Sequence, residues 1–164
     1  MLAYLQGLSL GLAYVAPIGV QNLFVINAGL SQPRAAAYRT ALIVIFFDVT
    51  LALAGFFGIG ALIEHSELIR KGVLLAGSLV VMYMGLRLML SREVAGPAIN
   101  VNIPLMKTIG MACVVTWVNP QAIIDVSLLL GSFRAALPPE ESGLFLWGVV
   151  CASCLWFLSL TTIS

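Results

Sequence analysis

Two aspartates are the residues of this sequence best suited to binding a cation or carrying a proton. Asp48 and Asp125 are each the only charged residue in a long apolar window, 40–63 and 108–133. A charged aspartate at the centre of a membrane helix costs about 2.5 to 3.5 kcal/mol on insertion scales, so it usually faces a cavity or a polar partner. The alternative is that each only bonds a neighbouring helix or lies near the hydrated membrane surface. This alternative weighs more for Asp48, which lies close to the start of its window.

A proline and two adjacent amides interrupt the first apolar stretch of the chain. Residues 1–33 contain no charged residue. As one helix they would be about 50 Å long at roughly 1.5 Å per residue, against a hydrocarbon core of about 30 Å. Pro17 cannot donate a backbone hydrogen bond inside a helix, and Gly19, Gln21 and Asn22 follow it closely. We therefore predict a functional helix break at Pro17 and Gly19, although a packing kink is the common alternative for a single proline.

The same features recur 103 residues later, around Pro120. Asn119 directly precedes this proline, and in this register Asp125 takes the place of Asn22, five residues after the proline. Two breaks with amides and a polar residue at the same distance favour a binding site over a kink. Freed backbone groups are tolerated at membrane depth where protein or a watery cavity satisfies them. Half-helix ends offer N–H donors on one side and carbonyls on the other, which suits a zwitterion.

The composition is that of an integral membrane protein. Of the 164 residues, 61% are hydrophobic and only 9% are charged, whereas soluble domains are nearer half apolar and about a quarter charged. The formal net charge of +1 gives no field that would attract nucleic acid. We also expect no cleaved secretory signal, because no basic segment precedes the first apolar run.

Five long apolar windows predict five transmembrane helices. Each window holds about 20 residues or more, which is enough to cross the bilayer, and the apolar runs are continuous rather than alternating, which argues against strands. The predicted spans are 1–30, 40–63, 72–90, 108–133 and 142–164. The longest connection, 91–107, divides a single membrane domain, 1–164, into two halves.

The two halves are predicted to form an inverted repeat. The unit between Pro17 and Pro120 contains three helices, an odd number, so the second copy would cross the membrane in the opposite direction. Such repeats, with broken helices near the midplane, are typical of secondary transporters. The predicted fold is therefore an all-α membrane protein of five helices, a 3+3 inverted repeat lacking its sixth helix. Residues 1–90 would form the first repeat and 108–164 a partial second, so the chain is either truncated or works with five helices.

Two cysteines offer a different chemistry. Cys151 and Cys154 have the spacing of a redox motif, here Cys-Ala-Ser-Cys, which would suit a membrane thiol oxidoreductase. Small residues at a helix interface are the far commoner reason for such a pattern inside lipid. We expect no disulfide framework, no cofactor and no metal site, and a transporter rather than an enzyme.

Several of these segments resemble signatures of the lysine exporter (LysE) family of membrane transporters. Residues 16–22, Ala-Pro-Ile-Gly-Val-Gln-Asn, resemble its Pro-x-Gly-Pro-Gln-Asn motif, with Val20 in place of the second proline. Residues 47–48, Phe-Asp, resemble the small residue and aspartate of its second span. The most specific match is 116–125, Thr-Trp-Val-Asn-Pro-Gln-Ala-Ile-Ile-Asp, which resembles Thr-Trp-Leu-Asn-Pro-x-Ala-x-x-Asp. Residues 152–157 resemble the fifth-span signature, and the likeness runs over the whole chain.

The resemblance implies efflux of amino acids across the bacterial inner (plasma) membrane, driven by the proton gradient or the membrane potential. The lysine/arginine branch is the closer one, and membrane carboxylates also suit a cationic side chain. Export of neutral amino acids, as in the homoserine/threonine branch, is the alternative. Family members carry a sixth hydrophobic segment beyond the five found here, so an inactive truncated transporter is a further alternative.

We therefore predict one binding site between the two helix breaks. The predicted substrate contacts are Gln21, Asn22, Asn119 and Asp125. The residues that break the helices are Pro17, Gly19 and Pro120. Asp48 would bind the cationic side chain of the substrate or carry a coupling proton. The expected partners are an amino-acid substrate and the lipid bilayer, without nucleic acid, and homo-oligomerisation stays open.

Overall fold

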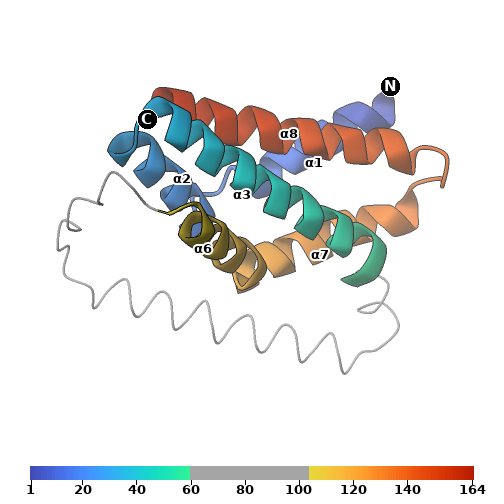
Figure 1. Cartoon of the computed structure of the whole chain (residues 1–164). Coiled ribbons are helices and arrows are strands. Elements are labelled where there is room, and N and C mark those ends of the chain that lie inside the picture. The colour runs from blue at the N-terminus through green and yellow to red at the C-terminus, as the bar shows by residue number, and fades with distance from the viewer. Residues whose placement is uncertain (60–103) are drawn as a thin grey trace.

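The computed structural model of the chain describes residues 1–59 and 104–164, and every regular element within them is a helix (Figure 1). Its elements are α1 (Leu2–Val15), α2 (Val20–Ser31), α3 (Arg34–Ala54), the short π-helical turn η1 (Gly55–Ile59), α6 (Leu105–Trp117), α7 (Pro120–Ala136) and α8 (Ser142–Ile163). The predicted third span, 72–90, and most of the connection 91–107 lie outside the described residues.

The first apolar stretch is folded as two half-helices. Between α1 and α2 the chain passes through Pro17 and Gly19, and the two helix axes differ by 80°. At about 1.5 Å per residue the two helices are only about 21 and 18 Å long, so neither crosses a hydrocarbon core of about 30 Å alone. The pair is therefore a broken span or a re-entrant loop.

The second proline also lies at a change of helix direction. α6 ends at Trp117 and α7 begins at Pro120, and the axes of residues 105–117 and 122–131 differ by 58°. A proline suits this first helical position, because it has no N–H to leave unpaired and its φ angle is already helical. The break here is shorter than the first one, with two residues between the helices.

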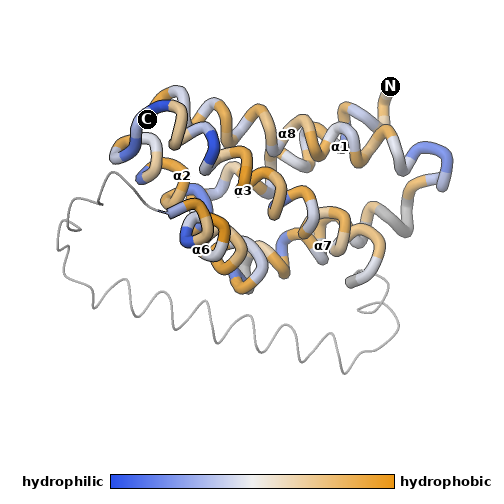
Figure 2. Tube along the Cα trace, viewed as in Figure 1, coloured by the Kyte–Doolittle hydropathy of each residue, from blue (hydrophilic) through white to orange (hydrophobic). Residues whose placement is uncertain are grey.

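Within the described residues, two helices are long and apolar enough to cross a membrane without a break. They are α8, of 22 residues, and α3 with most of η1, 25 residues over Arg34–Gly58. The total for the same residues is four spans if each bent pair counts as one. Figure 2 shows hydrophobic residues along most of both helices. The predicted connection 31–39 was too long, since α3 begins at Arg34, directly after Pro33. Similarly, α7 continues to Ala136, past the predicted end of that span at residue 133.

α1 and α8 approach so closely that only small residues fit between them. A Cβ added at Gly7 would collide with the backbone of Phe145, and one added at Gly148 would collide with the backbone of Tyr4. Close backbone approach through small residues is a common basis of helix association in membranes. These glycines therefore hold α8 against α1, and the residues of α8 that reach the helix break are placed by this contact.

An aromatic stack beside this contact joins α8 to η1 and α7. Phe145 of α8 stacks on Phe56 of η1, with ring centroids 5.7 Å apart, and on Phe133 of α7 at 5.5 Å. Gly55 allows η1 to lie directly against Val126 of α7. α3, α7 and α8 are thus locked together at this end, away from the two breaks.

Candidate functional site

A small cavity of about 30 Å³ lies between the two helix breaks. From the first break it is lined by Tyr14, Val15, Pro17, Gly19, Gln21 and Asn22. From the second break it is lined by Asn119, Ala122 and Asp125. The structure thus brings the four predicted substrate contacts, from two ends of the chain, to the wall of one cavity, and α7 starts beside it at Pro120. Asp48 is not part of this wall.

Asp48 lies behind the wall as the acceptor of a buried hydrogen-bond network. Its carboxylate accepts from the hydroxyl of Tyr14 at 2.5 Å, the hydroxyl of Ser153 at 2.6 Å and Nε2 of Gln21 at 3.3 Å. The side chain is only 1% exposed, and its three donors come from α1, α8 and α2. A buried carboxylate is stable only where such donors replace water. Asp48 therefore ties three helices to α3.

Two of these donors connect Asp48 to the cavity. Tyr14 and Gln21 both line the cavity and both bond to Asp48. A change in the charge or position of Asp48 would therefore be felt at the cavity wall through these two side chains. The geometry suits an aspartate that acts on the substrate indirectly, or that takes up a proton when the network opens.

Asp125 is placed differently from Asp48. It lies one turn into α7, is partly buried, and is the only carboxylate among the described residues that line the cavity. The N-terminal end of α2, capped by Gly19, also reaches the cavity, as does Asn119 just before α7. Free N–H groups at helix N-termini attract anions, whereas the carboxylate attracts cations. The wall of one cavity thus contains N–H donors suited to an anion and a carboxylate suited to a cation.

Asn22 is buried and fully bonded within the protein. Its Nδ2 donates to the carbonyl oxygens of Val15, at 3.0 Å, and Pro17, at 2.7 Å. Its Oδ1 accepts from Nε1 of Trp156 on α8 at 3.1 Å. The residue predicted as a substrate contact therefore also stabilises the first helix break.

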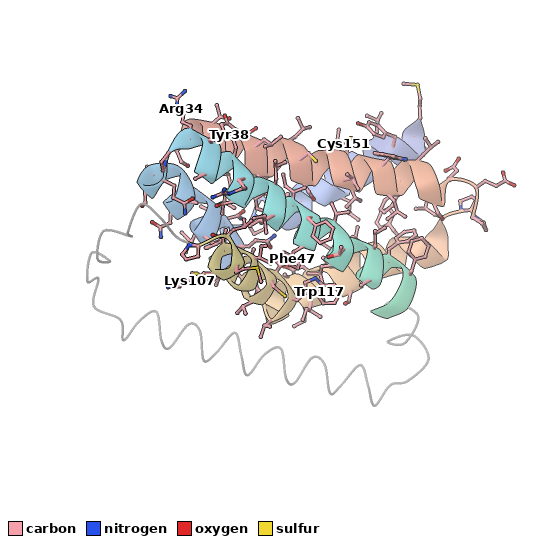
Figure 3. The ribbon with its side chains drawn as sticks, in the orientation of Figure 1. Arg34, Tyr38, Phe47, Lys107, Trp117 and Cys151 are labelled. Atoms are coloured by element: carbon pink, nitrogen blue, oxygen red, sulfur yellow. The ribbon has the colours of Figure 1, made fainter. Side chains whose placement is uncertain are left out.

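The second break is anchored to the helix that carries Asp48. Figure 3 shows Trp117 and Phe47 where α6 meets α3, while Arg34 and Lys107 lie at the starts of their helices. Nε1 of Trp117 donates to the hydroxyl of Thr50 at 3.2 Å, and Thr50 donates to the carbonyl oxygen of Phe47. Both breaks are therefore bonded to one short segment of α3.

Three residues of the site were missed from the sequence: Tyr14, Ser153 and Trp156. Tyr14 stands in an apolar helix with no charged neighbour, so only its hydroxyl, three residues before Pro17, hinted at a role. Ser153 and Trp156 do fall within 152–157, the segment that resembles a family signature. Their three-residue spacing puts both on one face of α8, and this was the available signal.

The cysteines form no disulfide in the structure. Cys151 and Cys154 lie one turn apart on α8 as partly buried free thiols (Cys151 in Figure 3). No group of three His, Cys, Asp or Glu side chains within residues 1–59 and 104–164 is arranged to hold a metal ion.

Nearly the whole chain resembles known membrane proteins. The family described as "LysE type translocator" matches residues 12–164. The arginine exporter protein ArgO of Serratia proteamaculans is 32% identical over 165 residues, which cover 98% of this chain and 80% of that protein. The protein of the same name from Pectobacterium atrosepticum is 31% identical with the same coverage. That of Escherichia coli K12 is 32% identical over 171 residues, 98% of this chain and 77% of the relative. No solved structure matches the chain.

Proposed function

Because the chain belongs to the LysE family of translocators, we propose that it exports amino acids, above all the basic amino acids arginine and lysine, across the bacterial inner membrane. Relatives that are about one third identical and aligned over 98% of this chain are named arginine exporters. The chain acts as a transporter rather than as an enzyme.

The observation that carries this proposal is the cavity between the two helix breaks. An amino acid needs donors for its carboxylate and acceptors for its ammonium group. The N-terminal end of α2 at Gly19 and the amides Gln21 and Asn119 supply donors. Asp125 supplies the acceptor and the negative charge that a guanidinium or ammonium group requires. The same cavity thus serves the zwitterion and the cationic side chain.

The two aspartates have different roles in the proposed mechanism. Asp125 pairs directly with the cationic group of the substrate, because it lines the cavity. Asp48 stays behind Tyr14 and Gln21, holds them at the wall, and takes up or releases the coupling proton when this network rearranges. A proton on Asp48 would turn one of its two acceptor oxygens into a donor, so at least one of the three present bonds would have to change.

Substrate entry requires the cavity to widen. A volume of about 30 Å³ holds about two or three water molecules, since about 10 to 15 Å³ of such space is needed for each. Arginine is several times larger than this space, so we propose that the structure represents a state too narrow to hold the substrate. The breaks at Pro17 and Pro120 are the natural hinges. We propose a 3+3 inverted repeat with residues 1–90 and 108–164 in opposite halves, and rocking of one half against the other alternates access.

Export from cells that express the chain tests the proposal. Cells loaded with labelled arginine, lysine or threonine should release arginine and lysine, and Asp125→Asn should lower this release at least about tenfold by removing a charge partner. Glu140→Gln, which removes an exposed carboxylate from the loop before α8, is the matched control and should leave export unchanged. Unchanged arginine export by Asp125→Asn at equal membrane abundance would remove Asp125 from the mechanism. Preferred release of threonine would replace the basic substrate by a neutral one.

A further inference from the structure

The break between α1 and α2 leaves backbone carbonyls that a continuous helix would have paired. Val15 is the last residue of α1 and Pro17 lies in the turn, so neither carbonyl has an N–H one helical turn ahead in the same helix. The amide of Asn22 donates to both. One side chain thus replaces two of the helical hydrogen bonds lost at the break. Inside a membrane, where water is scarce, such backbone groups need a partner within the protein.

Trp156 of α8 holds this amide in place. Its indole N–H is its single donor, and it is used on Oδ1 of Asn22. With two carbonyl acceptors on Nδ2 and one donor on Oδ1, both ends of the Asn22 amide are engaged, and the side chain is 3% exposed. Asn22 therefore lines the cavity while both of its N–H donors are committed to the protein itself.

α8 fixes both sides of the site from one of its faces. Ser153 and Trp156 are three residues apart, so they are neighbours on the helix surface. Ser153 donates to Asp48, which also accepts from the cavity-lining Tyr14. Trp156 donates to Asn22. The first chain of bonds reaches α1 through α3, and the second holds α1 to the start of α2.

We propose that Asn22 and Trp156 form a clasp that fixes the 80° break, so that Asn22 is a positioning residue for the site and does not contact substrate. The clasp keeps the end of α1 against the start of α2 and thereby keeps Tyr14 and Gln21 at the cavity wall. Its transport readout rests on the proposed export of amino acids, whereas its structural readout does not.

Backbone hydrogen exchange on the full chain without substrate gives the structural readout. Trp156→Phe keeps an aromatic ring and removes the N–H donor. We expect exchange to rise about tenfold at the helical amides on either side of the break, 13–16 and 23–26, and to stay unchanged at 113–117 beside the second break. Leu155→Phe changes the exposed neighbour on α8 and should alter neither region. Unchanged exchange at 13–16 and 23–26 in Trp156→Phe contradicts the clasp, whether or not the chain exports amino acids.

Arginine transport by proteoliposomes that contain the full chain gives the second readout. Trp156→Phe and Asn22→Ala should each lower the maximal rate about fivefold or more and change KM less than about threefold, because Gln21, Asn119 and Asp125 remain. The double variant should be no slower than Asn22→Ala alone, since both substitutions remove the same contact.

Two outcomes of the transport measurement would overturn the proposal. One is additive loss in the double variant. The other is a KM raised about tenfold by Asn22→Ala while Trp156→Phe behaves as the unmodified chain, which is the pattern of a direct substrate contact. If Asn22→Ala does not reach the membrane, the maximal rate and KM of Trp156→Phe test the clasp without it. An unchanged maximal rate in Trp156→Phe then contradicts the clasp. If the unmodified chain transports no amino acid, the proposed function fails and hydrogen exchange still judges the clasp.

Discussion

Asp48 accepts hydrogen bonds from three helices, and all three donors are neutral side chains. A hydrogen bond to a charged group contributes about 1.5 to 3 kcal/mol, more than one between neutral groups. The short bond from Tyr14 to Asp48 therefore contributes more to stability than a hydrogen bond between neutral groups would. It also joins the buried network to the cavity, because Tyr14 belongs to both.

Removal of the Tyr14 hydroxyl tests this bond. Tyr14→Phe should lower the free energy of unfolding by about 1.5 to 3 kcal/mol and should reduce arginine export, since the ring stays but Asp48 loses a donor. Thermal unfolding in detergent and export of labelled arginine measure the two effects. Tyr38→Phe is the matched control, because the hydroxyl of Tyr38 bonds Thr162 at an exposed position. Equal destabilisation by both substitutions would mean that the bond from Tyr14 to Asp48 stabilises the protein no more than an exposed hydrogen bond does.

The two thiols of α8 should be dispensable. Cys151 and Cys154 form no disulfide and are partly buried, and Cys154 packs against the apolar core. The double substitution Cys151→Ala and Cys154→Ala should keep arginine export within about twofold, because cysteine here behaves as a small apolar side chain. Export assays with and without a thiol-alkylating reagent measure this. Thiol chemistry would be favoured by two results together. The double variant would lose export, and reducing or oxidising conditions would abolish export by the unmodified chain.

Among the helices, α1 and α8 form the contact on which the site is built. Gly148 lies against the backbone of α1, and the residues of α8 that reach the break, Ser153 and Trp156, follow it on the same helix. A shift of α8 away from α1 would therefore move both of the bonds that this helix donates to the site.

Substitution of two glycines of α8 separates packing from helix propensity. Gly148→Ala places a Cβ against the backbone of Tyr4 and Leu8 and should destabilise the protein by about 1 to 3 kcal/mol. Gly143→Ala meets no atom within 4 Å, so it should be neutral or stabilise by up to about 1 kcal/mol. Thermal unfolding compares the two. Similar stability of both variants would contradict close packing of α1 on α8.

The sequence contained good information about where helices break and poor information about where they begin. Pro17 and Pro120 remove a backbone donor, and this local effect is readable without a structure. The start of α3 at Arg34 was not predicted, because an arginine near the end of a membrane helix can extend its long side chain toward water and so lies in the helix at little cost. The angles of 80° and 58° depend on the helices that pack around each break, and no local pattern specifies them.

In the molecule as a whole, two helix breaks that lie about 100 residues apart in the sequence meet at one cavity. The recurrence of proline and amides predicted that the breaks are related, and the cavity contains residues of both. The link from Asp48 to Tyr14, Gln21 and Ser153 was not predictable, because it depends on how four helices cross. A single sequence shows which polar residues need partners, but not which partners they find.

Access to the cavity should respond to substrate. In a chain whose three native cysteines are replaced by alanine, Ala122→Cys places one thiol on the cavity wall. A small thiol reagent should label it slowly, since the narrow cavity has room for only about two or three waters, and arginine should slow labelling further by occupying the site. Glu140→Cys in the exposed loop is the control, with fast labelling that arginine does not alter. Labelling at residue 122 that is fast and insensitive to every amino acid would place the substrate elsewhere.

The register of the proposed repeat sets Asn22 against Asp125, and these two side chains differ in one chemical respect. At the first break the amide of Asn22 donates to backbone carbonyls. At the second break the carboxylate of Asp125 is an acceptor that lines the cavity. Two identical halves of opposite direction would give inward-open and outward-open states of equal free energy by symmetry. The exchange of one amide for one carboxylate is one of the differences that remove this equality, so we expect the empty protein to rest mainly in one of the two states.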